Sequence, residues 1–175
     1  MNPCILRMWG FVLFKKAKPE KVMHSKFMNA ALSEARLAAK CGEVPVGAVV
    51  VKNGEIISAA HNLCEDGCCA LKHAEMLALD KAMGVLGDSR LDGCDLYVTL
   101  EPCVMCCGAI SHARIRRLYF GAYDKIGGGV VSNLHLFNPP SPLRSVEYYC
   151  GIMEAECSKL LTEFFKKLRS DIAST

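Results

Sequence analysis

Three short segments between Leu96 and Phe120 constrain the fold of this chain more than any other feature. Leu96–Thr99 and Leu118–Phe120 have the apolar, β-branched and aromatic residues typical of strands, and Val104–Ile110 between them has a helical pattern. A strand, a helix and a strand in close succession predict a unit in which both strands lie parallel in one sheet. We therefore expect an α/β fold built around this unit.

The segments before this unit predict a helix followed by a β-hairpin. Apolar residues recur at helical spacing over Met28–Ala38, and Gly42 is a typical residue just past a helix C-terminus. The run Val46–Val51 is apolar throughout, as in a strand that is buried on both faces. Asn53-Gly54 is the strongest short hairpin signal, so Glu55–Ala60 is expected to return antiparallel.

Two further helices and two irregular segments are expected in the rest of the chain. A polar, cysteine-rich loop over His61–Cys69 precedes a helix over about His73–Met83. This helix is apolar nearly all round, so it should be buried, and Gly84 is expected to end it. Glycine and proline clusters over Gly127–Pro142 indicate a long irregular connection. The final helix carries one apolar stripe: Cys157, Leu160, Leu161, Phe164, Phe165 and Leu168.

Length and composition indicate one globular domain. The chain has 175 residues, of which 51% are hydrophobic and 22% charged, a balance typical of a folded domain. We assign residues 23–175 to a single domain and residues 1–22 to an N-terminal extension outside the fold. A start of translation at Met23 is the alternative. The net charge of +3 neither requires nor excludes a nucleic-acid partner.

The apolar run Cys4–Phe14 is the one segment that resembles a targeting or membrane sequence. It is too short to span a bilayer, which takes about 20 apolar residues, and Arg7 interrupts it. Its basic residues follow the apolar run, whereas those of a signal peptide precede it. We therefore expect no membrane partner.

The eleven cysteines indicate the compartment. Their number is odd, and Cys68-Cys69 and Cys106-Cys107 are adjacent pairs. This pattern favours a reduced, cytoplasmic protein with a metal site over a disulfide framework. A second metal or redox site at Cys64, Cys68 and Cys69 stays open as an alternative to ordinary loop and core roles.

Two segments carry the residues that can do chemistry: His73-Ala-Glu75 and Pro102–Cys106. Cys103 and Cys106 are three residues apart at the start of a helix, so both sulfurs can face one ion. The helix N-terminus also favours their thiolate forms. With His73 they make three protein ligands, the number typical of a catalytic zinc site. The alternative is a set of buried core residues without a metal.

Glu75 is the candidate proton carrier beside this metal. Side chains two residues apart in mid-helix diverge by about 200°, so Glu75 and His73 can converge only beyond the N-terminal end of their helix. The polar loop before His73 is consistent with that placement. Together the two segments match the H-x-E…P-C-x-x-C signature of zinc nucleobase deaminases.

A longer resemblance is carried by GEVPVGAVVV (42–51), HAEMLAL (73–79), LYVTLEPCVMC (96–106), GAI (108–110), ARIRRLYFGAYD (113–124), GIMEAEC (151–157) and LLTEFF (160–165). Over about Phe27–Arg169 the chain resembles the bacterial tRNA-specific adenosine deaminases, the TadA family. The short signature alone indicates only the deaminase superfamily, whereas the long central block is much more specific.

This resemblance implies a three-layer α/β/α cytidine-deaminase-like fold with a central mixed sheet of about five strands, and a homodimer. It implies hydrolytic deamination of adenosine to inosine at the wobble position of a tRNA anticodon, with the anticodon stem-loop as partner. One Zn²⁺ per subunit would be bound by His73, Cys103 and Cys106. Glu75 would move protons to the purine ring and to the departing ammonia.

The resemblance also assigns contacts to the target base. Asn62 occupies the position that contacts the nucleoside, and it is otherwise a typical turn residue. Val46 and Ala48 would face one side of their strand, with Val46 lining the base pocket. Asp124 lies where the flanking nucleotides approach.

The end of the final helix resembles the part of the family that meets the anticodon stem-loop. Phe164, Lys166 and Arg169 are the residues concerned. Without the resemblance, they indicate core packing and a solvated helix face. The chain departs from the family pattern at Lys72 and at Gly127–Gly129.

Two other functions stay open at this point. A protein with the same fold and zinc site can deaminate a free base or nucleoside such as guanine or cytosine, although the block Leu96–Asp124 and the basic tail argue against this. A non-catalytic, zinc-stabilised binding module is the second alternative. Glu75 argues against it, because a purely structural site needs no carboxylate there.

Overall fold

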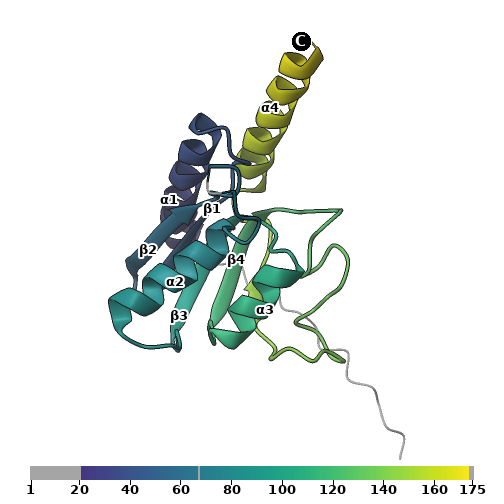
Figure 1. The fold of residues 1–175 in the computed structure, drawn as a ribbon. Coiled ribbons are helices and arrows are strands. Elements are labelled where there is room, and N and C mark those ends of the chain that lie inside the picture. The colour runs from purple at the N-terminus through teal and green to yellow at the C-terminus, as the bar shows by residue number, and fades with distance from the viewer. Residues whose placement is uncertain (1–20, 67, 174–175) are drawn as a thin grey trace, which may run out of the picture.

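The structure, a computed structural model, describes residues 21–66 and 68–173 of the chain (Figure 1). Its elements are α1 (Lys21–Lys40), β1 (Gly47–Lys52), β2 (Glu55–His61), α2 (Ala74–Leu86), β3 (Cys94–Leu100), α3 (Val104–His112), β4 (Arg117–Ala122), β5 (Glu147–Tyr149) and α4 (Glu154–Ala173). The expected extension 1–22 lies outside the described residues, except that Lys21 and Val22 begin α1. Within the described ranges, no helix is long and apolar enough to cross a membrane.

The sheet has five strands in the order β2-β1-β3-β4-β5. β1 pairs antiparallel with both of its neighbours, whereas β3, β4 and β5 are mutually parallel. The predicted parallel unit over Leu96–Phe120 is therefore confirmed as β3-α3-β4. The hairpin is confirmed too, because Asn53 and Gly54 have the positive φ angles, 52° and 82°, that a tight two-residue turn requires.

Helices cover both faces of the sheet, which gives the expected three layers (Figure 1). Alternate strand residues face opposite ways. Val49, Tyr97 and Tyr119 pack in the cluster beneath α1 and α4. Val50 and Phe120 belong to the larger cluster beneath α2 and α3. The N-terminal ends of α2 and α3 are thereby held on one face of the sheet.

A row of stacked aromatic rings joins the parallel strands. Tyr97, Tyr119 and Tyr149 occupy paired positions on β3, β4 and β5, and their ring centroids are 4.4 and 4.9 Å apart. His24 of α1 stacks on Tyr119 at 4.5 Å. Such cross-strand pairs stabilise a sheet and fix its register. Here they attach the short strand β5, which the residue pattern did not predict.

The predicted end of α2 is wrong. The helix continues through Gly84 to Leu86, and Gly87 ends it in the left-handed conformation with φ 62°. The expectation that this helix is buried on all sides is also wrong, since Val85 is 67% exposed. Only one stripe of the helix is buried, formed by Ala74, Glu75, Ala78, Leu79 and Ala82. A helix that lies on the surface of a sheet buries one stripe whatever its composition.

The apolar stripe of α4 is covered only near its start. Cys157 is buried, and Leu160 and Leu161 pack against the second cluster. Further along, Phe165 and Leu168 are 38% and 44% exposed. In Figure 1 the C-terminal half of α4 projects beyond the body of the domain.

Candidate active site

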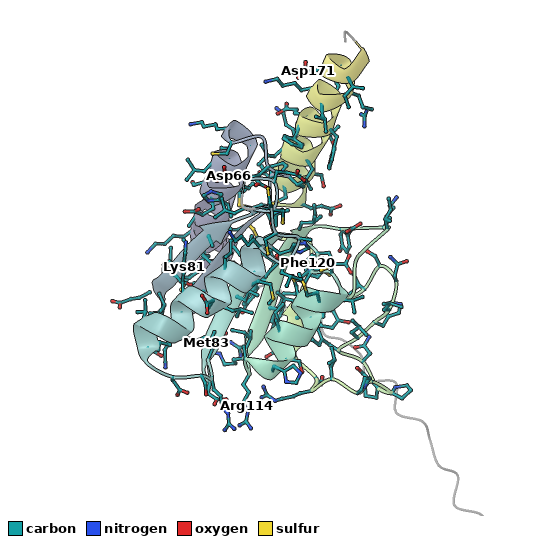
Figure 2. The ribbon with its side chains drawn as sticks, in the orientation of Figure 1. Asp66, Lys81, Met83, Arg114, Phe120 and Asp171 are labelled. Carbon is teal, nitrogen blue, oxygen red and sulfur yellow. The ribbon has the colours of Figure 1, made fainter. Side chains whose placement is uncertain are left out.

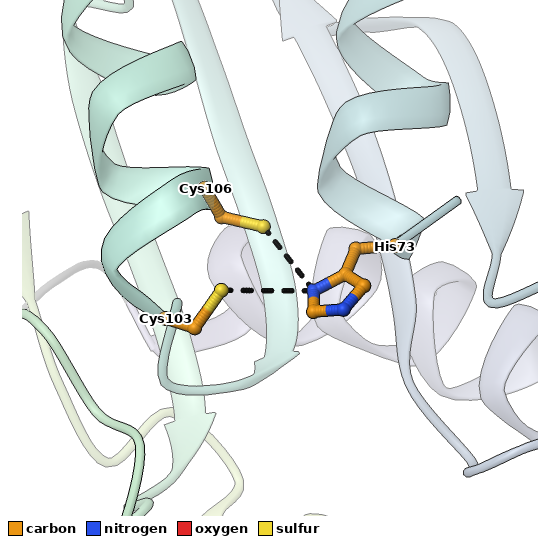
Figure 3. A group of neighbouring side chains, drawn as sticks. All are labelled: His73, Cys103 and Cys106. Carbon is orange, nitrogen blue, oxygen red and sulfur yellow. Dashed lines mark hydrogen bonds between the residues drawn. The ribbon is translucent and has the colours of Figure 1, made fainter. Parts of the chain in front are cut away.

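Two helix N-termini meet at one end of the sheet. His73 is the N-cap residue of α2, and Cys103 is the N-cap residue of α3. Cys106 follows in the first turn of α3. Because the two cap residues stand at the ends of their helices, their side chains reach across the gap between α2 and α3 (Figure 3).

The spacing of the three side chains suits a zinc ion. Nδ1 of His73 lies 3.6 Å from Sγ of Cys103 and 3.5 Å from Sγ of Cys106. Tetrahedral zinc, with Zn–S of about 2.3 Å and Zn–N of about 2.0 Å, places neighbouring ligand atoms about 3.5 Å apart. Among residues 21–66 and 68–173, this is the one group of three or more such side chains placed to hold a metal. Three ligands leave the fourth zinc position open.

The two thiols already differ in proton affinity. The pKa of Cys103 is lowered to about 4, because Cys106 hydrogen-bonds to it and His73 adds a second hydrogen bond, against the opposing effect of burial. The pKa of Cys106 is raised by its hydrogen bond to Cys103 and by burial. The two shifts are opposite because the two thiols share one hydrogen bond, and a zinc ion would bind both sulfurs as thiolates.

Glu75 lies beside these three side chains, in the first turn of α2. Its side chain is 4% exposed and hydrogen-bonds to that of Cys106. Burial raises the pKa of Glu75 to about 7. A carboxyl group with this pKa can both take up and release a proton near neutral pH. The convergence of Glu75 and His73 beyond the helix end agrees with the geometry expected from their spacing.

A cavity of about 440 Å³ opens in front of the group, and its lining includes Val46, Asn62, His73, Glu75, Cys103 and Asp124. Ala48 is not part of this lining. It faces the same side of β1 as Val46 but lies two residues deeper, fully buried in the core beneath α2 and α3. Phe164, Lys166 and Arg169 lie on α4, outside the lining.

Asn62 and Asp124 both organise the backbone around this cavity. Oδ1 of Asn62 accepts a 2.9 Å hydrogen bond from the N–H of Ala74, whereas His73 makes no side-chain cap of its own helix. Asn62 therefore takes over the capping, and the imidazole of His73 is free to face the thiols. Oδ1 of Asp124 accepts the N–H groups of Ile126 and Gly127, which folds the following loop.

The remaining cysteines near the site have other surroundings. Cys107 is fully buried, and its thiol donates to the carbonyl oxygen of Pro102, as expected of a core residue. Cys64, Cys68 and Cys69 form no metal-binding group among the described residues. These observations favour the loop and core roles over a second metal site.

Two buried carboxylates at the cavity were missed by sequence reasoning. Glu43 and Glu101 are 1% and 2% exposed, and both belong to the cavity lining. The signal was present, since each is a lone acid in an apolar stretch: Glu101 directly precedes Pro102, and Glu43 lies two residues before Pro45. Buried acids require hydrogen-bond partners, which sequence alone does not reveal.

Comparison with known proteins identifies the family. Residues 21–122 match the model of the cytidine and deoxycytidylate deaminase zinc-binding region. The chain is also 49% identical over 146 residues to the tRNA-specific adenosine deaminase of Aquifex aeolicus (strain VF5), a match that covers 83% of this chain and 96% of that protein. The chain belongs to the tRNA-specific adenosine deaminases.

Solved structures agree with this placement in the deaminase family. A structure from studies of A-to-I editing by tRNA:A34 deaminases at the wobble position of transfer RNA has a TM-score of 0.76 and 45% identity, covering 78% of this chain and 99% of that chain. A guanine deaminase from Nitrosomonas europaea is more distant, with a TM-score of 0.66 and 26% identity over 80% of this chain and 83% of that chain. This deaminase therefore resembles the tRNA enzyme more closely than the free-base enzyme.

Proposed function

We propose that this protein is a zinc-dependent hydrolase that converts adenosine to inosine at the wobble position of a tRNA anticodon. The observation that carries the proposal is the group His73, Cys103 and Cys106 beside the buried Glu75, at one end of a cavity. The overall reaction consumes adenosine and water and releases inosine and ammonia. The C6–N6 bond of the base breaks, and a C6–O bond forms.

His73, Cys103 and Cys106 would hold one Zn²⁺ per subunit. When bound, zinc supplies a water of lowered pKa, and hence a nucleophile at neutral pH. His73 and Cys103 line the cavity, whereas Cys106 lies behind them. The three side chains therefore leave the side toward the cavity free for a substrate.

Glu75 is the residue that moves protons in this scheme. Its carboxylate would take one proton from the attacking water and pass it to N1 of the purine. It would then take the remaining proton from the new C6 hydroxyl group and deliver it to the amino group, which leaves as ammonia while the C6 carbonyl forms. The pKa of about 7 suits both directions of transfer. A positioned acid–base group of this kind is typically worth ~10²–10⁴ in rate.

Three residues of the lining are proposed to position the base. The amide oxygen of Asn62 is used by Ala74, so its amide nitrogen is the group that would donate to the nucleoside. Val46, just before β1, would supply an apolar contact. Asp124 starts the loop that would approach the flanking nucleotides. Ala48 lies behind the cavity lining, where it packs in the hydrophobic core and would not contact the base.

We propose that the C-terminal part of α4 binds the anticodon stem-loop. Lys166 and Arg169 are exposed there, and the ring of Phe164 packs edge-on against that of Phe165. Cations neutralise phosphates, and exposed aromatic rings can stack on unpaired bases. The projection of α4 beyond the domain leaves this face accessible (Figure 1).

A homodimer and a cytoplasmic location complete the proposal. All ten cysteines in the described part of the chain are free, which is consistent with a reducing compartment. The dimer rests on the family resemblance, and sedimentation of the purified protein tests it directly.

A substrate panel tests the proposed function against free-base deamination. The panel contains an anticodon stem-loop with adenosine at the wobble position, the same stem-loop with adenosine moved by one nucleotide, and free adenosine, guanine and cytosine. The proposal predicts ammonia release from the first RNA alone. Comparable turnover of a free base would support the rival function instead.

A further inference from the structure

Glu43 and Glu101 are buried carboxylates at the cavity that the proposed chemistry does not use. A buried charge is costly unless it is paired or fully hydrogen-bonded. Among the ion pairs of residues 21–66 and 68–173, none includes either glutamate. Both carboxylates instead accept hydrogen bonds from backbone N–H groups, and each does so from a different loop.

Glu43 binds the loop between β2 and α2. Its Oε2 accepts the N–H of Cys64 at 3.0 Å, and its Oε1 accepts those of Glu65 at 2.8 Å and Asp66 at 2.9 Å. The described residues of this loop form no helix or strand. The carboxylate therefore supplies the acceptors that a regular element would otherwise provide.

Glu101 binds the loop between β4 and β5 in the same way. Its Oε1 accepts the N–H groups of Val130, Val131 and Ser132 at 3.1, 2.7 and 2.9 Å. Its Oε2 accepts the N–H of Asp124 at 3.2 Å and the hydroxyl of Ser132. One side chain thus gathers both ends of the segment from Asp124 to Ser132.

The glycines of this loop allow it to lie against the site. A Cβ on Gly128 would come within 2.6 Å of the Glu101 carboxyl carbon and 2.4 Å of the Asp124 carbonyl oxygen. The N–H of Gly129 donates to the carbonyl oxygen of Pro102 at 2.8 Å, and Gly128 forms a β-bridge with Cys103. Glu101 therefore connects the loop to the backbone that carries a proposed zinc ligand.

The geometry points to Glu43 and Glu101 as a pair of positioning residues that hold the two loops of the cavity in the shape that accepts the substrate base. The inference rests on the proposed function for the identity of that substrate. A carboxylate suits the task because it only accepts hydrogen bonds and can accept several at once. Hydrogen bonds to a charged acceptor are also about twice as strong as neutral ones.

The test replaces each glutamate with the isosteric amide, in Glu43→Gln and Glu101→Gln. The amide keeps the volume but presents an NH₂ group where an acceptor is needed. Asp66→Asn is the matched control, because its exposed carboxylate lies in the loop that Glu43 binds, while its N–H bond to Glu43 remains (Figure 2). Ser132→Ala, which removes one hydroxyl donor to Glu101, is a milder variant.

Three readouts are compared with wild type: zinc content, hydrogen exchange of the loop amides, and steady-state kinetics with the anticodon stem-loop. Each glutamine variant should keep its zinc. Amide hydrogen exchange should become at least about tenfold faster only in the loop that the replaced glutamate binds, residues 64–66 in Glu43→Gln and residues 130–132 in Glu101→Gln. KM should rise about tenfold, with kcat within about threefold of wild type. Ser132→Ala should show the same changes in loop exchange and KM as Glu101→Gln, but smaller ones. Asp66→Asn should show neither change.

Unchanged loop exchange in both glutamine variants would overturn the inference. A lower yield of folded, zinc-loaded protein with an unchanged KM would also overturn it, because a purely structural role predicts that result. If the wild-type protein releases no ammonia from the stem-loop, the proposed function fails by itself. The exchange measurement still decides whether the glutamates hold the loops.

Discussion

Sγ of Cys106 lies 3.5 Å from Nδ1 of His73, although 33 residues separate the two in the chain. The residues stand at the N-terminal ends of α3 and α2, and both helices pack on the same face of the sheet. The order of the strands determines where α2 and α3 lie on the sheet, and this brings the two residues together. The packing of the helices on the sheet, rather than any local motif, sets the distance between these side chains.

Replacing the proton carrier should separate metal binding from chemistry. Glu75→Gln keeps the shape of the side chain and leaves all three ligands in place, so zinc content should stay near one per chain. Single-turnover inosine formation should fall by ~10²–10⁴, because the amide cannot carry a proton. Metal analysis and product mapping check the two parts, and a rate within tenfold of wild type would rule out the assigned role.

Removing a proposed zinc ligand should lower the zinc content, whereas Glu75→Gln should leave it unchanged. Cys103→Ala leaves two ligands, so the protein should purify with little zinc. Cys107→Ala is the matched control, since this neighbouring thiol lies outside the ligand group and contacts Pro102. Metal analysis of both proteins decides the point. A full zinc complement in Cys103→Ala would show that another residue is the ligand.

The C-terminal part of α4 should contribute binding rather than turnover. Lys166→Gln and Arg169→Gln should each weaken stem-loop binding and reduce the slope of log Kd against log salt by about one for each phosphate that the variant no longer neutralises. The rate at saturating RNA should not change. Lys159→Gln is the control, because Lys159 pairs with Glu163 earlier on the helix. Equal effects of all three variants would mean that net charge, and not this end of α4, attracts the RNA.

Close packing of α1 on the sheet makes one glycine irreplaceable. A Cβ on Gly47 would lie 2.1 Å from the carbonyl oxygen of Ala31, so Gly47→Ala should destabilise the fold by at least ~1–3 kcal/mol. Gly84→Ala is the contrasting variant, since nothing lies within 4 Å of its Cβ. Inside α2 it should stabilise by ~0.5–1 kcal/mol. Thermal unfolding measures both changes, and a Gly47→Ala protein as stable as wild type would contradict the packing.

The elements that sequence predicted well are those with local signals. The unit over Leu96–Phe120, the Asn53-Gly54 turn and the meeting of His73 with Glu75 follow from residue period, turn chemistry and helix geometry. Residue type and spacing also predict that His73, Cys103 and Cys106 form one group, as the structure shows. The distances within that group depend on helix packing, whereas the other features need no information about distant contacts.

The features that sequence missed depend on tertiary contacts. β5 has three residues and is attached by pairing with β4 and by the stacked Tyr149. α2 passes Gly84 because Leu86 still packs against the core. Ala48 falls behind the cavity because this part of the lining is formed by Glu43, Val44 and Val46, which precede β1, and not by the strand itself. Glu43 and Glu101 acquire their roles from loops far along the chain.

Inosine mapping with and without zinc tests whether the metal is required for deamination of the wobble adenosine. The purified protein is incubated with a stem-loop carrying the wobble adenosine, before chelation, after exhaustive chelation, and after one equivalent of Zn²⁺ is returned. We expect inosine at the wobble position in the first and third samples and none in the second. Undiminished inosine formation by protein shown to be free of metal would contradict it.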